Sequence, residues 1–389
     1  MPTSIADNLR FEPVELPEAT GSLRAEVRTF LNEELKDYSP VTRSHSWEAY
    51  DREFSEKLGA KGWLGMTLPT AYGGHGRTAF ERYVVVEECL VAGAPTGMHW
   101  VADRQSGPLL VRYGTQEQKQ TIVPRIAAGK ACFCIGMSEP NSGSDLASLR
   151  TKAEKTSNGW LVNGTKIWTS NAHRADYMIA LFRTDPDPDK KHAALSQFLI
   201  DLNKAEGITP RPIKNLAGGR VFNEVSFVDV ELPEDALVGK EGEGWRQVTE
   251  ELAFERSGPE RYLSCFFLVR KLIDAIGKNA SAATLSRLGA QIAWALTLRN
   301  MSLNITSRLE AGEDPVLQAA VVKDLGCQWE QGLPGLAQEI CELEPTLEGH
   351  GIDYQQVLGS LVQVTPSFSL RGGTPEIMRG IIAKGMGIR

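Results

Sequence analysis

The sequence predicts a mainly helical α+β protein in which two helical regions flank a β-rich middle. Three observations predict this order. Apolar residues recur at helical spacing near the N-terminus, short β-branched and aromatic runs separated by turn residues fill the middle, and helical spacing returns after Glu243. The expected domains are a helical region at 1–129, a small antiparallel sheet or barrel at 130–235, and a second helical region at 240–389.

The N-terminal region is predicted to contain several helices, at 23–35, 50–64, 78–93 and 115–129. Pro69 and the pair Gly73-Gly74 separate the second helix from the third. Pro124 is expected to break the fourth, because proline lacks the backbone N–H of a helix interior.

The middle region is predicted to contain short strands, at 159–162, 167–169, 177–182, 198–200 and 221–227. Asn163-Gly164 between the first two is a strong hairpin signal. The C-terminal region is predicted to be helical again, at 245–256, 260–277, 281–311 and 316–330. A last helix should begin near Pro375, since proline is favoured in a first helical turn.

Composition excludes several functional classes. The chain has 389 residues and a net charge of −7 with mixed signs, which disfavours a nucleic-acid-binding surface. No apolar run is long enough to span a membrane, and the N-terminus lacks the apolar segment of a secretory signal, so we expect a cytoplasmic location. The six cysteines have no clustered histidine or cysteine partners, which predicts buried thiols rather than a metal site.

Two segments carry the strongest chemical signal. Met137 to Asp145 is a hydroxyl-rich turn of small residues, where the backbone can approach a ligand closely. Gly164 to Asn171 follows the hairpin signal and sets the indole of Trp168 between hydroxyl-bearing residues. Together they are typical of a platform for a flat cofactor with polar edges.

These two segments resemble the flavin-binding middle domain of the acyl-CoA dehydrogenase family. Segments at 62–74, 113–124, 222–245 and 372–379 are similar to further family signatures in the same order. The resemblance implies an N-terminal helical domain, a flavin-binding middle β-barrel and a C-terminal four-helix bundle. It implies FAD as cofactor, α,β-dehydrogenation of an acyl-CoA thioester to the trans-2-enoyl-CoA, and an electron-transfer flavoprotein or a similar acceptor as partner.

The resemblance also implies site residues. Those expected around FAD are Ile135, Met137, Ser138, Ser144, Trp168, Ser170, Thr374 and Glu376. Glu376 departs from the family, which usually carries a neutral amide there, and a carboxylate would repel a phosphate. Trp100 falls at the floor of the family's acyl pocket, although the polar run after it, Asp103 to Gln105, equally fits a solvated helix face.

The catalytic base has two family positions. Many members carry a glutamate immediately before the Gly-Thr of the C-terminal motif, and Gly372 occupies that position here. Other members, of the isovaleryl and long-chain type, carry it on the first helix of the C-terminal domain, which corresponds to Glu255. We therefore predict Glu255 as the base, with Arg256 and Gly372 at the substrate. Glu260 is the alternative, because Gly258-Pro259 disturbs the helical register.

Two elements of homotetrameric members are missing. An Arg-x-x-Phe-Gly stretch is absent at 276–281, and a glycine-rich turn is absent at 342–351. Both serve the cofactor of a neighbouring subunit in the family. The pattern resembles catalytic subunits of heteromeric members, which predicts a homologous second subunit or, failing that, a homo-oligomer. The alternatives are a flavin oxidase or monooxygenase of the same fold, and a non-catalytic subunit.

Overall fold

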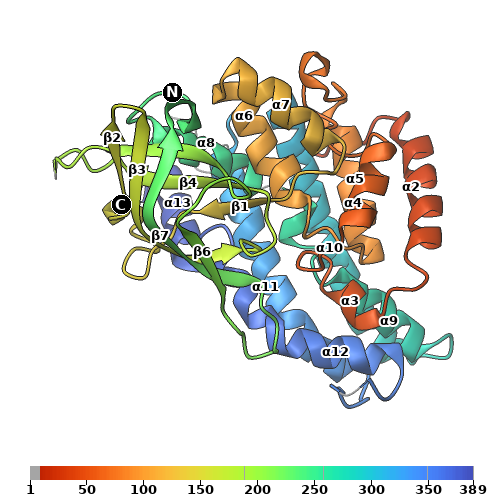
Figure 1. Ribbon diagram of the computed structural model, residues 1–389. Helices are drawn as coiled ribbons and strands as arrows, with labels where there is room; N and C mark the ends of the chain where they lie inside the picture. The colour runs from red at the N-terminus through yellow and green to blue at the C-terminus, as the bar shows by residue number, and fades with distance from the viewer. Residues whose placement is uncertain (1–8, 188, 257, 348, 389) are drawn as a thin grey trace. The chain divides into compact units, whose positions relative to one another are not determined.

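The computed structural model describes residues 9–187, 189–256, 258–347 and 349–388, without the side chains of 252–255 (Figure 1). In these ranges the chain forms twelve α-helices and one curled sheet of seven strands. It divides into two compact units. Unit 1 takes the described residues of Met1–Tyr50, Arg77–Gly97 and Ala253–Arg389, and unit 2 those of Asp51–Gly76 and Met98–Leu252.

The predicted fold class is confirmed, since helices flank a sheet formed by the middle of the chain. The two units are not consecutive stretches of the sequence, because each of them combines segments that are distant in the chain. The predicted three-domain boundaries therefore stay a prediction.

The sheet lies in unit 2. Its strands are β1 (Phe133–Gly136), β2 (Lys152–Thr156), β3 (Gly159–Ser170), β4 (Tyr177–Arg183), β5 (Leu195–Asp201), β6 (Ile208–Pro212) and β7 (Phe222–Pro233). The order is β1-β4-β2-β3-β7-β6, and β5 pairs with β4. The sheet is mixed rather than purely antiparallel, because β1 and β2 both run parallel to β4.

Strands β3 and β7 form the long central pair of the sheet, and this pair is irregular in two places. The register shifts between Val162 and Gly164 and again between Lys166 and Thr169. Such bulges increase the local twist and re-aim side chains next to functional sites. The second bulge contains Trp168.

The helices of unit 2 are α4 (Arg52–Ala60), α6 (Gly107–Tyr113), α7 (Gln116–Ala127) and most of α8 (Gly244–Glu255), with a π-helical segment η2 (Ala102–Ser106) before α6. Leu110, Val123 and Ile179 are among the residues of one core beneath the sheet. The predicted break at Pro124 is wrong, because α7 continues through it. The carbonyl that Pro124 leaves unbonded belongs to Gln120, which is exposed to water.

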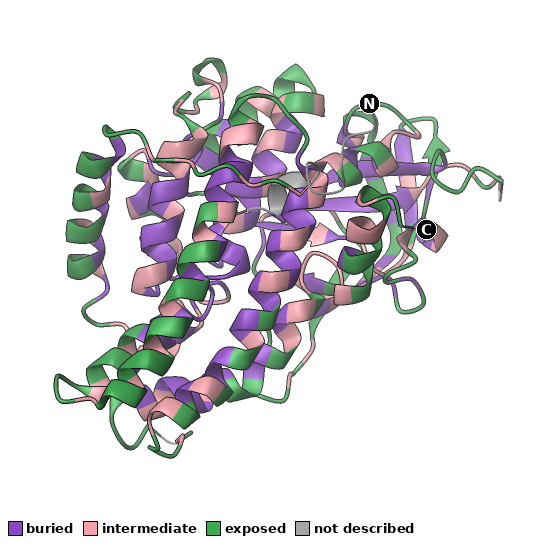
Figure 2. Cartoon of the chain, turned by 180° about the vertical axis from the view of Figure 1, so that it is seen from behind, coloured by how far each residue is buried: buried purple, intermediate pink, exposed green. Residues whose placement is uncertain are grey.

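The helices of unit 1 are α2 (Thr20–Glu34), α3 (Pro40–Ser44), α5 (Ala79–Ala92), α9 (Phe266–Ile276), α10 (Ala282–Glu310), α11 (Val316–Ile340), α12 (Asp353–Val364) and α13 (Pro375–Gly385). Helices α9 to α12 share one hydrophobic core, to which they contribute Leu268, Leu298, Trp329 and Leu358 respectively. Figure 2 shows buried and exposed residues on opposite sides of many of the helices. This core is that of the expected C-terminal helical bundle.

Two details of the bundle differ from the sequence prediction. Helix α11 continues past 330 to Ile340, through Pro334. The missing N–H of Pro334 leaves the carbonyl of Glu330 without its helical partner, and the Cys265 thiol donates to that carbonyl at 3.8 Å. Helix α12 lies beyond the predicted helices and was not anticipated.

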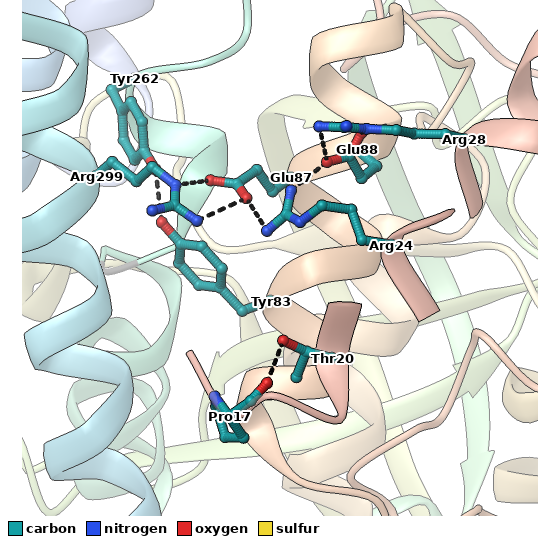
Figure 3. A network of polar contacts seen from close by, with 9 residues as sticks. All are labelled: Pro17, Thr20, Arg24, Arg28, Tyr83, Glu87, Glu88, Tyr262 and Arg299. Atoms are coloured by element: carbon teal, nitrogen blue, oxygen red, sulfur yellow. Dashed lines mark hydrogen bonds and ion pairs between the residues drawn. The ribbon is translucent and has the colours of Figure 1, made fainter. Parts of the chain in front are cut away.

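Unit 1 also contains a buried network of ion pairs between α2, α5 and α10 (Figure 3). Glu87 binds Arg24 at 2.7 Å and Arg299 at 2.5 Å. Glu88 accepts from Arg28 at 2.7 Å and from Arg24. Both carboxylates are buried, so the three guanidiniums offset the cost of removing them from water. The network fastens α2 and α10 to α5.

Candidate active site

The indole of Trp168 is exposed on a strained stretch of backbone. Trp168 has φ of 60°, a conformation that non-glycine residues seldom adopt, and its side chain is 58% exposed. It contacts the ring of Phe222 edge-on, with ring centroids 6.2 Å apart. Such a backbone conformation costs about 1–3 kcal/mol and persists where the surrounding structure enforces it. The bulge thus presents one face of a large aromatic ring to the outside of unit 2.

The hydroxyl-rich turn is attached directly beside this indole. The N–H of Ile167 donates to the carbonyl of Ser138 at 2.8 Å, which joins the turn to β3 one residue before Trp168. Ser138 and Met137 are half-buried, as are Ile135 on β1 and Ser170 at the end of β3, whereas Ser144 is exposed. The two predicted segments therefore meet, and most of the predicted residues of unit 2 gather around their junction.

A buried ion pair that the sequence reasoning missed lies under the turn. Lys166 is fully buried, and its Nζ donates to Glu139 Oε1 at 2.9 Å and to the carbonyl of Met137 at 3.1 Å. Glu139 also accepts from the N–H groups of Arg150 at 2.6 Å and Thr151 at 2.9 Å. The available signal was a lysine inside a strand rich in apolar residues, because a buried cation requires a partner.

Burial and pairing act against each other on these two groups. Burial lowers the pKa of Lys166 to about 8, although the attraction of Glu139 opposes the shift. Burial pushes the pKa of Glu139 upward, but Lys166 and the donors from Thr151 and Arg150 outweigh it, so that pKa lies below its usual range. Both groups are charged near neutral pH and hold the turn against β3.

These side chains are chemically suited to a flavin. The exposed indole offers a flat face, and the hydroxyls of Ser138 and Ser170 with the nearby backbone offer partners for a polar edge. The strain at Trp168 keeps a large aromatic ring outside the core of unit 2. A role in binding a flat ring system against that face would explain why this strained conformation is kept.

The segment after Trp100 is buried and irregular. Residues 102–106 form a π-helix, a rare insertion that is frequent at functional sites. Asp103 is buried and accepts from the N–H of Gly65 at 2.7 Å, and the buried guanidinium of Arg104 lies 4.3 Å from the ring centre of Trp100. The solvated-face alternative for this run is therefore wrong. Trp100 itself is half-buried, and its role at an acyl group stays a prediction.

In unit 1, residue 255 at the end of α8 lies close to Gly372, the other position at which family members carry the base. Glu255 is the last residue of α8, and its side chain lies outside the part of the chain that the structure describes. The next residue, Arg256, is buried, and its Nε donates to the carbonyl of Gly372 at 3.0 Å. The end of α8 thus lies against the position where many family members carry their glutamate.

The alternative base, Glu260, has a different setting. It is buried in the short 3₁₀ turn η5 (Pro259–Arg261), and its carbonyl accepts from the Ser264 hydroxyl at 3.0 Å. A Cβ placed on Gly258 would lie 1.9 Å from Glu260 Oε2. The carboxylate therefore folds back over Gly258 within its own turn.

The C-terminal motif is held by a lysine and by helix capping. Lys323 is fully buried and donates to the carbonyls of Ser369, at 3.0 Å, and Gly373. Thr374 caps α13 by accepting from the N–H of Ile377 at 3.5 Å. Glu376 is exposed in the first turn of α13, and its hydrogen bond with Thr374 lowers its pKa. Capping of α13 and the hydrogen bond between Thr374 and Glu376 account for both side chains without a ligand. Their contact with a cofactor therefore stays a prediction.

A pocket of about 590 Å³ lies elsewhere in unit 1, beside the ion pairs of Figure 3. Arg24, Glu87, Tyr262 and Arg299 line it together with apolar side chains, and none of the predicted site residues does. Glu87 and Glu88 already pair with the three arginines that line the pocket, so we assign it no role in the site.

The structure also bears on metals, thiols and membranes. Among the described residues, no group of three or more histidine, cysteine, aspartate or glutamate side chains is placed to hold a metal ion. The six cysteines are free, and all but Cys341 are buried, as predicted. In the same part of the chain, no helix combines the length and apolar character needed to cross a membrane.

Comparison with known proteins identifies the family. Residues 17–130 match the acyl-CoA dehydrogenase N-terminal domain, and residues 134–230 match the acyl-CoA dehydrogenase middle domain. Acyl-CoA dehydrogenase IpdE1 of Mycobacterium tuberculosis is 32% identical over 376 residues, which cover 93% of this chain and 95% of that protein.

Comparison with solved structures points to the same family. The Tcur3481-Tcur3483 steroid ACAD has a TM-score of 0.85 at 29% identity, covering 97% of this chain and 100% of that one. The ChsE4-ChsE5 complex from Mycobacterium tuberculosis has a TM-score of 0.82 at 28% identity, with the same coverage. The chain therefore belongs to the acyl-CoA dehydrogenase family, oxidoreductases that act on the CH–CH bond of acyl-CoA thioesters.

Proposed function

We propose that this protein is an FAD-dependent acyl-CoA dehydrogenase that uses Glu255 as its catalytic base. The observation that carries the proposal is the hydrogen bond from Arg256 to the carbonyl of Gly372. It brings the end of α8 to the position where a glutamate is missing. A carboxylate at residue 255 can then serve the same reacting carbon from a different element of the fold.

In this proposal each unit contributes its own residues. Glu255 removes the proton from the α-carbon of the thioester, and the buried surroundings of Arg256 exclude water from that step. Bound FAD would supply the acceptor for the hydride that leaves the β-carbon. Trp168 would support one face of the flavin ring system, and Lys166 with Glu139 fixes the turn that carries Ser138.

Substitution of the base is the direct test. We expect Glu255→Gln to lower the rate of flavin reduction by an acyl-CoA by at least about 1000-fold, because an amide of the same shape cannot accept the proton. Flavin binding and thioester binding should be kept. The measurement is anaerobic stopped-flow absorbance of the flavin-loaded protein, mixed with octanoyl-CoA or a steroid side-chain thioester.

Glu260→Gln is the matched control, since it makes the same change on the neighbouring buried glutamate. We expect its rate within about tenfold of the wild type. Loss of reduction in Glu260→Gln with a rate retained in Glu255→Gln would reverse the assignment.

We also propose that a related second chain completes the cofactor site, as the missing motifs at 276–281 and 342–351 suggest. The similar ChsE4-ChsE5 structure is a complex of two differently named chains, which supports this arrangement. Binding of partner and FAD would then be thermodynamically coupled. Calorimetric titration of the chain with FAD should show tighter binding once the partner is added. Full, tight FAD occupancy in a purified homomer would contradict the proposal.

A further inference from the structure

Arg371 is a buried guanidinium whose hydrogen-bonding capacity is largely unused. It directly precedes Gly372, and its side chain is only 13% exposed. Nε and Nη1 are buried and have no hydrogen-bond partner among the residues that the structure describes. Nη2 lies 3.5 Å from Glu330 Oε2, which is long for a hydrogen bond. A buried donor left without an acceptor is costly, so its persistence requires an explanation.

Aromatic rings fix the position of this guanidinium. Its Cζ lies 3.7 Å from the ring centre of Phe368 and 4.4 Å from that of Trp47. Contacts of this kind hold a planar cation while leaving its N–H edges available to an acceptor. The side chain is therefore positioned by stacking and not by its hydrogen bonds.

The buried carboxylate that pairs with Arg371 is already engaged by another donor. A second buried guanidinium, Arg261, lies 5.1 Å from the ring centre of the same Trp47. The fully buried carboxylate nearby is Glu330, and its Oε1 is already occupied by the N–H of Ser264 at 2.7 Å. Glu48 adds a more distant negative charge. Glu330 therefore offers Arg371 only one long contact, and the unused donors Nε and Nη1 favour the entry of another anion.

We propose that Arg371 binds a carboxylate carried by the acyl group of the substrate, so that the enzyme prefers acyl-CoA thioesters with a second acidic group. The inference rests on the proposed function, because it takes Gly372 as a neighbour of the reacting carbons. Arg371 directly precedes that glycine in the chain, and Arg256 joins the same glycine to the end of α8. A guanidinium suits a carboxylate because its planar N–H donors match the two oxygens.

Matched substrates test the proposal. With the flavin-loaded protein and its partner, kcat/KM is measured for the CoA thioesters of hexanoic, octanoic and decanoic acids and for their ω-carboxy counterparts. We expect the ω-carboxy thioester to be preferred by about 10- to 100-fold at one or more chain lengths, the range of a charge-assisted hydrogen bond. Arg371→Gln should abolish that preference through KM, and Arg371→Lys should restore part of it.

Arg287→Gln is the control, because it makes the same substitution on an exposed arginine of unit 1, whose Nη1 donates to the carbonyl of Glu339 at 3.1 Å. It should leave the preference intact. Thermal unfolding of each variant reports on the fold, and a preference unchanged in a folded Arg371→Gln protein would overturn the proposal.

Two further outcomes separate failure of this inference from failure of the proposed function. A shift of the kcat/KM pH profile that is equal for both kinds of thioester would mean that Arg371 acts on the base, and would overturn recognition of the acyl group. Failure of every thioester to reduce the flavin would refute the proposed function itself, and this inference with it.

Discussion

Two buried ion-pair systems, one in each unit, differ in how they are built. In unit 1, Glu87 and Glu88 share three guanidiniums, which are 20%, 60% and 28% exposed at Arg24, Arg28 and Arg299. In unit 2, one lysine faces one glutamate, and Lys166 is 0% exposed. The first system has several cations with partial access to water, whereas the second has a single cation that is buried from water.

This difference separates support of the fold from support of the site. The network of unit 1 joins α2, α5 and α10 (Figure 3), and a lost partner there can be replaced by another guanidinium or by water. The pair of unit 2 holds the carbonyl of Met137 and the turn beside Trp168, and Lys166 is the only cation that pairs with Glu139 among the described residues. A single change in unit 2 should therefore disturb both stability and the cofactor, and a change in unit 1 stability alone.

The largest effect is expected for Lys166→Met, which leaves the buried Glu139 without its cation. We expect the free energy of unfolding to fall by about 3–5 kcal/mol, the usual cost of breaking a buried pair from one side. FAD binding should weaken as well, because the turn at 137–139 loses its anchor. Urea unfolding and a flavin titration measure the two effects.

The double variant Lys166→Met/Glu139→Gln is the control, since removing both charges avoids an unpaired carboxylate. It should regain part of the lost stability. A loss below about 1 kcal/mol in the single variant would show that the pair is dispensable, contrary to the comparison.

A smaller effect is expected for Glu87→Gln in unit 1. The amide keeps the shape but loses the charge that binds Arg24 and Arg299, so we expect a loss of about 1.5–3 kcal/mol. The affinity for FAD should stay within about twofold of the wild type, a difference of less than 1 kcal/mol. Reduced FAD affinity in a folded Glu87→Gln protein would remove the distinction between the two systems.

The smallest effect concerns alkaline pH. An ordinary lysine keeps its proton up to about pH 10.5, whereas Lys166 in the folded protein has a pKa of about 8. Between these values the unfolded state binds more protons, so the Lys166 contribution to stability rises with pH. The difference in free energy of unfolding between wild type and Lys166→Met should grow by at most about 1.4 kcal/mol per pH unit. If the difference in free energy of unfolding between the two proteins became smaller from pH 8 to pH 10, this predicted direction would be wrong.

The order of elements was predictable because hydrophobic periodicity reports directly on helices and strands. Strand β6 was missed because Pro210 and Pro212 argue against a strand. It is an edge strand that pairs only with β7 in the described sheet, so its prolines remove few ladder hydrogen bonds. Helix α9 begins at Phe266 and not at 260, because the 3₁₀ turn at Pro259 and the residues after it are not α-helical.

The site was predictable where the chain itself carries the signal. Ser138 and Trp168 lie in segments whose residue types already suggest a cofactor platform. The pairing of Lys166 with Glu139 spans 27 positions, and that of Arg371 with Trp47 spans far more. Such contacts depend on how the sheet and the helices fold, and no local pattern specifies them.

The most direct test of the central claim is flavin reduction by an acyl-CoA. The protein, with its related partner if it needs one, is purified with bound FAD and mixed anaerobically with an acyl-CoA thioester. We expect the oxidised flavin absorbance to bleach and one trans-2-enoyl-CoA to form per flavin reduced. Unchanged absorbance with every thioester, in a protein that holds its FAD, would contradict the assignment as an acyl-CoA dehydrogenase.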